Sequence, residues 1–524
     1  IVSTQEGSAM VQPAQTSPLA GQPVLTILRQ HPLRYLGMAL VFVAIFSGKF
    51  SFDRFVAETS RTPWLELRIW ASVLACAVAF FLIYRGHLKI PAFRKELLLG
   101  LAFIVLLHGY FIVNAVLIGD VTRQAEYILD FSLLLLWAFL VVFYFRSQAD
   151  LIVFSIIAEA VALTLFILAL LGWGNPDLNG EGWAPLGGTI TFYRIEFLAF
   201  CAGLYLSTLT TATYSKGIHL MVAGIGLFSA LASLSKAAFI AAFCVALVAI
   251  FNLLSVKQYQ RAAGIATITC AVFFGFFWIK GDLLQNRVER ATGSTLTVRP
   301  AEPAVCPAGI TPPPWSLLHA YSTRILEKIQ LQQAISIDDL TEEERTQLRT
   351  LWQVFKKDDL PHYLADLKPF LLSINGIVVL KDGTTRLPMA LTAWDAFVPH
   401  KWFGIGVGNY IYQGFNSCTD VIDIYRYPHN IILEILATTG LFGIVLFLGA
   451  VFYFQVLLRR YFLRDSASIC LAGYGMFIII TALFAGDIYD FRLYWYIGLI
   501  ILVTSPSFLN YHWPTGSPKE TPAL

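Results

Sequence analysis

Long apolar segments constrain the fold of this chain more than any other feature of its sequence. A helix needs about 20 residues to cross the roughly 30 Å hydrocarbon core of a bilayer, and the chain holds about twelve apolar runs near that length. Of its 524 residues, 57% are hydrophobic and 14% are charged, which is more apolar surface than a soluble core can bury. We therefore predict an all-α polytopic membrane protein with about twelve transmembrane helices.

The apolar runs divide the chain into two membrane regions, one long connection and two tails. Residues 25–280 hold the first nine spans, residues 431–508 hold the last three, and residues 281–430 connect the ninth span to the tenth. The polar segment 1–24 is predicted to be disordered and shows no cleavable signal pattern, and residues 509–524 form a C-terminal tail. The spans are expected near residues 35–50, 67–84, 97–118, 126–145, 151–172, 190–209, 218–234, 237–255, 263–280, 431–456, 468–486 and 493–508.

Positive charges in the short loops predict the orientation, because cytoplasmic loops carry an excess of Lys and Arg. Such residues precede the first span, separate the second from the third, precede the ninth and follow the tenth. They are Arg29, Arg34, Arg85, Lys89, Arg94, Lys95, Lys257, Arg261, Arg459, Arg460 and Arg464. All lie on one face if both termini are cytoplasmic, and the 281–430 connection then lies outside the cytoplasm. The formal net charge of +3 gives no indication of a nucleic-acid partner.

The long connection has a proline-rich beginning, a helical middle and a glycine-rich end. Residues 299–315 carry too many prolines for regular structure. Thr341 and Glu344 have the spacing of a capping box ahead of an amphipathic segment. A glycine-rich return, Trp402–Tyr410, leads back to the membrane. We predict a small helical subdomain on the outer face of the membrane, with an insertion near residues 295–385.

The cysteines fall into two groups. Five of the seven lie in apolar spans, where a thiol behaves as a small hydrophobic group. Cys306 and Cys418 lie in the long connection, where an oxidising compartment would allow them to pair. We hypothesise a disulfide between them, and two unpaired thiols remain an equally open interpretation.

The main charged residues within the predicted spans are Asp130, Glu159, Arg194 and Glu196. An unpaired charge in hydrocarbon is costly, so such residues face a partner or a polar cavity. Structural pairing is the favoured interpretation for Asp130 and Glu159. Arg194 is expected within the outer two turns of its span, and there we favour a functional role.

Further cations gather on the predicted outer side of the membrane. They could anchor the protein to lipid headgroups, but guanidinium groups also bind phosphate through paired planar hydrogen bonds. A cavity lined by several of them would suit a diphosphate, and a diphosphate at the membrane indicates a lipid-linked donor. The candidate diphosphate-binding residues are Arg194, Lys236, Arg287, Arg290, Arg386 and Arg492.

A histidine stands directly before the tenth span, in the segment Pro428–Gly443. Asn430 is the expected helix N-cap, and Glu434 lies about one turn inside the helix. A histidine titrates near neutral pH and can accept a proton from a hydroxyl nucleophile, and the positive end of the helix favours the neutral ring. A base at His429 and an ordinary boundary residue both remain open at this point.

These residues resemble a known family. His429-Asn430, nine residues, Gly440, two residues and Gly443 are similar to a motif of bacterial O-antigen ligases. The stretch from Arg386 to Tyr410 looks like the segment that precedes this motif in the O-antigen ligase and polymerase superfamily. Ser235-Lys236 resembles the Ser-Arg turn of that superfamily, with lysine in place of arginine.

The resemblance implies a metal-independent transferase without a cofactor in a bacterial inner membrane, multi-pass and with its active site facing the periplasm. It would move a glycan from undecaprenyl diphosphate to an acceptor hydroxyl. His429 would be the base, Arg386 the diphosphate-binding arginine of the outer loop, and Lys236 the second basic position. Lysine lacks the bidentate fork of arginine, so Arg194 could supply the planar contact. Asn430, Glu434, Gly440 and Gly443 would support the site.

Three functions are therefore expected, in order of preference. The first is an O-antigen ligase whose acceptor is lipid A core. The second is a polymerase of O-antigen or exopolysaccharide, or a protein O-oligosaccharyltransferase, with the same donor. The third is a non-enzymatic transporter of polysaccharide or lipid, which a dozen spans with internal charges would also allow. The sequence shows no evident inverted repeat, which favours the first two.

Overall fold

The computed structural model describes the backbone of most of the predicted membrane region. The described residues are 29, 31–48, 66–86, 95–119, 124–172, 189–255, 257–292, 386–412, 428–462, 466–485 and 488–504. Within them, the side chains of residues 189, 252, 255, 280–292, 386–389, 391–392, 411–412, 459–462, 466–470 and 485 are not described. Most of the predicted outer subdomain, the 295–385 insertion included, therefore lies outside the described residues.

Helices make up the regular structure of this described part, so the prediction of an all-α protein is confirmed there. The long helices before the outer subdomain are α2 (Pro32–Phe46), α3 (Leu67–Tyr84), α4 (Lys95–Leu117), α5 (Gln124–Tyr144), α6 (Gln148–Leu170), α7 (Thr189–Leu209), α8 (Thr213–Ala232), α9 (Lys236–Ser255) and α10 (Tyr259–Thr292). After it come α14 (Arg386–Phe397), the short 3₁₀ turns η8 (Val398–His400) and η9 (Asn409–Tyr412), and the helices α16 (Ile431–Phe462), α17 (Ser466–Ala485) and α18 (Arg492–Thr504).

Eight of these helices are long and apolar enough to cross a membrane. They are α3, α4, α5, α6, α7, α8, α10 and α16. Four shorter apolar helical segments, in α2, α9, α17 and α18, occupy the other predicted spans. The chain is thus a multi-pass membrane protein, and the count of about twelve spans stays a prediction.

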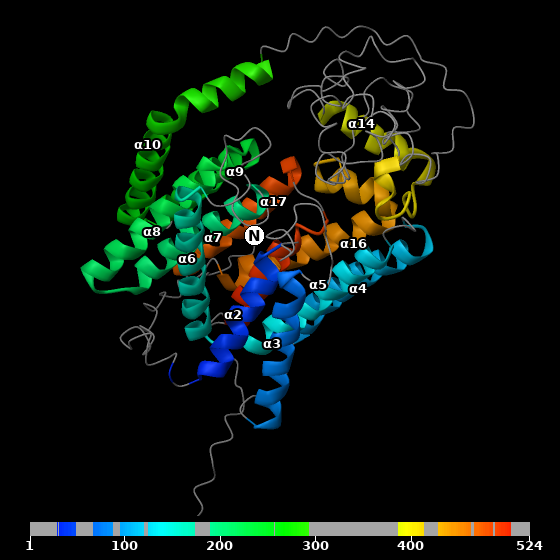
Figure 1. Cartoon of the computed structure of the whole chain (residues 1–524), viewed down its shortest axis with the longest axis horizontal. Coiled ribbons are helices and arrows are strands. Elements are labelled where there is room, and N and C mark those ends of the chain that lie inside the picture. Colours follow the sequence, from blue (N-terminus) through cyan, green and yellow to red (C-terminus); the bar gives the residue numbers. More distant parts are fainter. Residues whose placement is uncertain are drawn as a thin grey trace, which may run out of the picture.

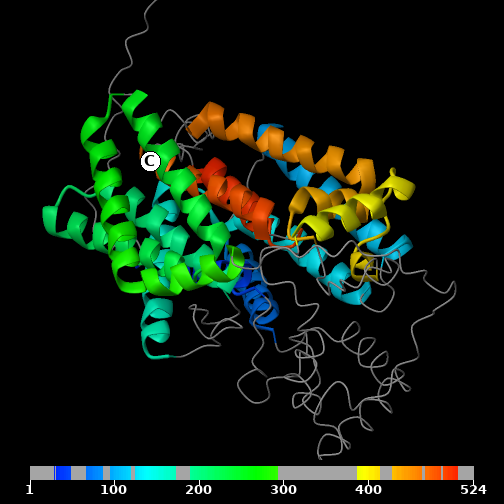
Figure 2. The ribbon, with the colours of Figure 1, turned by 90° about the horizontal axis from the view of Figure 1, so that it is seen from above.

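The helices form a bundle with α7, α17 and α18 at its centre. Figures 1 and 2 both show α8, α9 and α10 on one side of the molecule and α4, α14 and α16 on the other, with α17 between them. Large apolar side chains stay exposed on the peripheral helices, among them Phe80, Trp278 and Val445. Exposed apolar surface on helices of this length is typical of contact with lipid.

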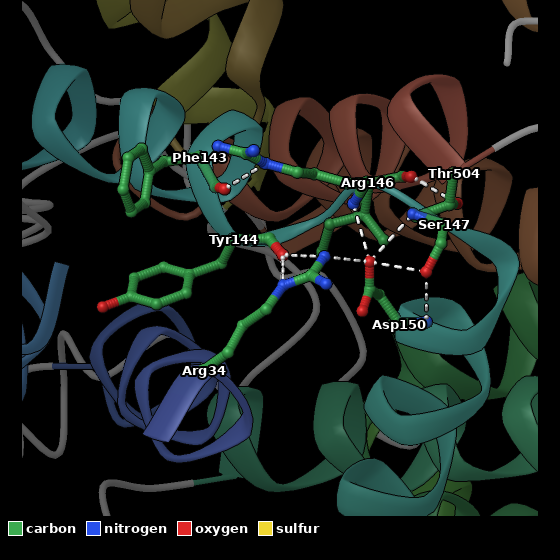
Figure 3. Close-up of polar contacts among 8 residues, drawn as sticks. Arg34, Phe143, Tyr144, Arg146, Ser147, Asp150 and Thr504 are labelled. Carbon is green, nitrogen blue, oxygen red and sulfur yellow. Dashed lines mark hydrogen bonds and ion pairs between the residues drawn. The ribbon is translucent and has the colours of Figure 1, made fainter. Parts of the chain in front are cut away.

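Polar contacts join the start of α2, the end of α5 and the start of α6 (Figure 3). The Arg34 guanidinium donates to the Tyr144 carbonyl and pairs with Asp150 at 2.5 Å. Asp150 also accepts from the backbone N–H of Arg146 and of Ser147, both at 2.8 Å, and Ser147 caps α6. The starts of α2 and α6 and the end of α5 thus lie together, as expected when successive helices cross a membrane in alternating directions.

Two charges within the predicted spans are paired, as expected. Glu159 of α6 contacts His219 Nδ1 of α8 at 2.9 Å. Asp130 of α5 contacts Arg68 Nη2 of α3 at 2.7 Å. These pairs tie neighbouring helices together and reduce the cost of placing charge within the bundle.

Candidate functional site

The His429 motif begins with an unusual backbone conformation. His429 is half-buried and has a φ of 52°, in the left-handed region. Histidine and asparagine tolerate this region better than most residues, but it still costs free energy. Asn430 follows as the N-cap of α16, since its Oδ1 accepts from the backbone N–H of Ile432 at 3.0 Å and of Leu433 at 3.1 Å. The sequence here turns sharply into the helix and holds the imidazole at its N-terminus.

The same motif is tied to the end of α17 and to the connection between α17 and α18. Asn430 Nδ2 donates to the Leu483 carbonyl at 3.0 Å. Glu434 Oε2 accepts from the Ile488 backbone N–H, also at 3.0 Å. One residue caps the helix and the other lies in its first turn, so these bonds fix the start of α16 against the end of α17 and this connection.

The α17–α18 connection also carries the centre of an arginine cluster. Asp490 Oδ2 lies 3.0 Å from Arg194 Nη1, and Asp490 Oδ1 lies 3.3 Å from Arg492 Nη1. Arg492 Nε donates to the carbonyl of Ile45 at the end of α2, and its guanidinium lies 4.1 Å from the centre of the Tyr489 ring. The structure thus brings together two of the predicted diphosphate-binding residues, Arg194 and Arg492, through a shared carboxylate.

Sequence reasoning missed a third arginine of this cluster. Arg68 of α3 pairs with Glu66 and Asp130 and donates to the Tyr489 hydroxyl. Its guanidinium lies 5.1 Å from the centre of the Tyr489 ring, whose other close cation is Arg492. The signal in the sequence was Arg68 itself, a cation at the outer start of the second predicted span.

The cluster is balanced in charge within the described residues. Three guanidinium groups face three carboxylates, those of Glu66, Asp130 and Asp490. Burial alone would raise the pKa of Asp490, but the guanidinium groups of Arg194 and Arg492 outweigh it and hold the pKa of this carboxyl below its usual range. Arg194 and Arg492 are themselves buried, so their guanidinium groups lie beneath the surface of the protein.

Asp490→Asn is expected to lower the free energy of unfolding by about 3–5 kcal/mol, because two buried guanidinium groups lose their shared counter-charge. Since the folded-state pKa of Asp490 is lowered, its contribution is present above about pH 4 and is lost as the pH falls through the folded-state value. The gap in thermal stability between wild type and variant should therefore close in acid. Thermal unfolding in detergent at several pH values measures this, with exposed Asp395→Asn as the control. An equal effect of both changes would contradict a structural role for Asp490.

The glycine-rich return inserts into the hydrogen-bond ladder of α16. In an unbroken helix, Leu441 N–H and Phe442 N–H would donate to the carbonyls four residues earlier. Here they donate instead to the return, to Lys401 O at 2.8 Å and Trp402 O at 3.2 Å. The two carbonyls released in α16, those of Ala437 and Thr438, accept from the return in exchange, from Ile405 N–H and Gly406 N–H at 2.9 Å each. The break thus leaves these backbone groups satisfied.

Glycines at the break allow the two backbones to come this close. Gly440 has a φ of 65° and a ψ of −161°, and a Cβ there would lie 2.5 Å from the Trp402 backbone. Gly404, also at positive φ, would place a Cβ 2.3 Å from the Thr438 backbone. A Cβ on Gly443 would lie 1.9 Å from Thr439 Oγ1. The insertion of the return therefore explains Gly440, whereas Gly443 leaves room for the Thr439 side chain of the same helix.

Helix α14 packs on the part of α16 before the break, and both views place these helices side by side (Figures 1 and 2). A small apolar cluster joins them, with Ala393 and Ala396 of α14 against Leu433 and Ala437 of α16. Arg386 is the first residue of α14. The helix that begins with the predicted diphosphate-binding arginine is thus packed against the helix that begins after His429.

The other predicted site residues are placed as follows. Lys236 is exposed and begins α9, directly after a tight turn in which buried Leu234 has a φ of 56°. Ser235 in this turn lies near the hydroxyl of Tyr193, the neighbour of Arg194. The side chains of Arg386, Arg287 and Arg290 are not described, although their backbones are helical, and Cys306 and Cys418 lie outside the described residues.

The fold and the site define a class of protein: a multi-pass, all-helical membrane protein with a histidine-led broken helix beside a buried arginine cluster. Residues 363–448 match the family model described as O-antigen ligase. This match includes α14, the return and the His429–Gly443 motif, and it confirms the resemblance to the O-antigen ligase and polymerase superfamily. It supports a glycan-transferring role of the ligase or polymerase type. A comparison with curated proteins finds no match.

Proposed function

We propose that this protein transfers a glycan from undecaprenyl diphosphate to an acceptor hydroxyl at the periplasmic face of a bacterial inner membrane. The preferred acceptor is lipid A core, which makes the protein an O-antigen ligase. The observation that carries the proposal is the family match over the segment that holds His429 and its broken helix. The bonds from Asn430 to the end of α17 and from Glu434 to the connection that bears Asp490 add support.

The reaction is a single displacement at the anomeric carbon. The acceptor oxygen forms a bond to this carbon while the bond to the diphosphate oxygen breaks, and the leaving diphosphate takes the bonding electrons. His429 receives the acceptor proton as general base. Cations stabilise the negative charge that develops on the leaving group. Arg386 and Lys236 are the proposed contacts of the diphosphate, with Arg287 and Arg290 as further candidates. Arg194 and Arg492 lie beneath the proposed site, where both pair with Asp490.

Charge at the proposed site fits an anionic donor. Lys236 is an exposed ammonium at the N-terminus of α9, where the helix dipole adds positive potential. His429 lies at the N-terminus of α16. A diphosphate near these two helix starts would meet backbone N–H groups as well as side-chain cations.

Two experiments test the proposal. Purified protein in liposomes is given a polyprenyl-diphosphate-linked oligosaccharide together with lipid A core. Formation of a glycan joined to the core, with release of polyprenyl diphosphate, is the expected result. If the donor stays intact and only moves from one leaflet of the bilayer to the other, the protein is a transporter. Complementation of a ligase-deficient strain and, separately, of a polymerase-deficient strain then distinguishes the two acceptors.

A further inference from the structure

The outer half of α4 forms a row of polar contacts with the segment that carries the proposed site. Tyr110, Asn114 and Ile118 are spaced four residues apart, so they lie along one face of the helix end. Each of the three makes a hydrogen bond outside α4, to the break in α16 or to the return. None of the three residues is part of the family match at 363–448.

Asn114 holds the return at two points with one side chain. Its Nδ2 donates to the Phe403 carbonyl at 2.9 Å, and its Oδ1 accepts from the Val407 backbone N–H at 2.9 Å. The Asn114 side chain is buried, and the two backbone groups it binds lie on either side of Gly404 and Gly406. It therefore closes the turn that these positive-φ glycines make.

Tyr110 and Ile118 extend this contact in both directions. The Tyr110 hydroxyl donates to the Thr439 carbonyl, next to Gly440, at 2.7 Å. At the other end, Asn409 of the return donates to the Ile118 carbonyl at 2.7 Å. A Cβ on Gly406 would lie 1.9 Å from that same carbonyl, so the two backbones are in direct contact.

We infer that Asn114 is a positioning residue for the proposed transfer, acting through the return on the placement of His429 and of α14. The inference rests on the proposed function. The return bonds to α16 before the break on one side and continues from α14 on the other, so a shift of the return moves both segments that carry the proposed reacting groups. Misplacement of reacting groups by about 1 Å can cost about 100-fold in rate.

The test is Asn114→Leu, which keeps the number and branching of the side-chain heavy atoms but can make neither hydrogen bond. We expect the kcat of glycan transfer to fall by about 10- to 100-fold while the KM for a polyprenyl-diphosphate-linked oligosaccharide stays within about threefold. His108→Leu on the same helix is the matched control. His108 is equally buried, but its Nδ1 bonds to the Ile104 carbonyl within α4, so its loss should leave kcat near wild type.

Tyr110→Phe provides a second variant with a smaller structural change, because it removes only the hydroxyl bonded to Thr439. A several-fold fall in its kcat supports the inference even where Asn114→Leu folds poorly. Wild-type kcat in both variants overturns it, as does an equal fall for Asn114→Leu and His108→Leu that follows their loss of folded protein. His429→Asn is run in parallel, since full activity in that variant would refute the role of His429 as base. A wild-type protein that transfers no glycan would refute the proposed function and not the contacts of Asn114.

Discussion

His429→Asn is expected to lower the rate of glycan transfer by at least about 100-fold, the usual range for loss of a general base. Asparagine suits this position because it tolerates the left-handed backbone that the structure shows at a φ of 52°. It also lacks a group that can accept a proton near neutral pH. The substitution therefore removes the proposed chemistry and keeps the local fold.

The measurement is the initial rate of glycan transfer in liposomes with saturating donor, together with the thermal midpoint of the purified variant. The matched control is His400→Asn. His400 is an exposed histidine in η8 whose Nδ1 lies 3.3 Å from the Ala396 carbonyl, and its variant should retain transfer. Wild-type rates in His429→Asn would rule out a catalytic role for this ring. A loss of folded protein equal to the loss of rate would show that His429 serves the fold alone.

Gly440→Ala is expected to abolish transfer by a different route. A side chain at a φ of 65° is strained by roughly 1–2 kcal/mol, and the new Cβ would lie 2.5 Å from the Trp402 backbone, where no flexible side chain can yield. The return must then leave the ladder of α16. The four backbone hydrogen bonds between the return and α16 would then be lost, and each buried backbone group left unpaired costs about 1–3 kcal/mol.

Gly449→Ala in the same helix is the control for this change. A Cβ there meets Phe103 at 3.6 Å, an ordinary contact, and alanine is the better helix former by about 1 kcal/mol. We expect normal transfer and equal or higher thermal stability for Gly449→Ala, and a large loss of both for Gly440→Ala. Comparable behaviour of the two variants would mean that the insertion of the return is not needed for the active protein.

Much of the helical layout followed from hydrophobic length alone. The second span was expected at 67–84 and forms α3 over Leu67–Tyr84, because a run of apolar residues in a helix needs no distant partner to be recognised. The sequence also predicted that Asp130 and Glu159 would each have a partner, because an unpaired charge within a span is costly. Their partners are Arg68 and His219. These predictions depend on local composition and on the cost of burying charge.

The rest of the site depends on contacts between distant segments. Arg68 and Tyr489 are 421 residues apart, and nothing local in either segment predicts their contact. Asn114 stands in an apolar run, where a single amide gives no sign that it binds a distant segment. Its partner Val407 lies 293 residues further along the chain. The motif of His429, Gly440 and Gly443 was visible, but the reason for Gly440 was not, because that reason is the backbone of Trp402 and Gly404.

The shared ladder of α16 and the return has a consequence for how the protein is made. Lipid offers no hydrogen-bond partner, so a span with open backbone groups cannot rest in a bilayer. In its kinked form, α16 has such groups on both sides of Gly440 until residues 401–406 supply their partners. The return precedes α16 in the chain and leaves the ribosome first, so we expect the two to enter the membrane as one folded hairpin, with α16 unable to insert correctly on its own.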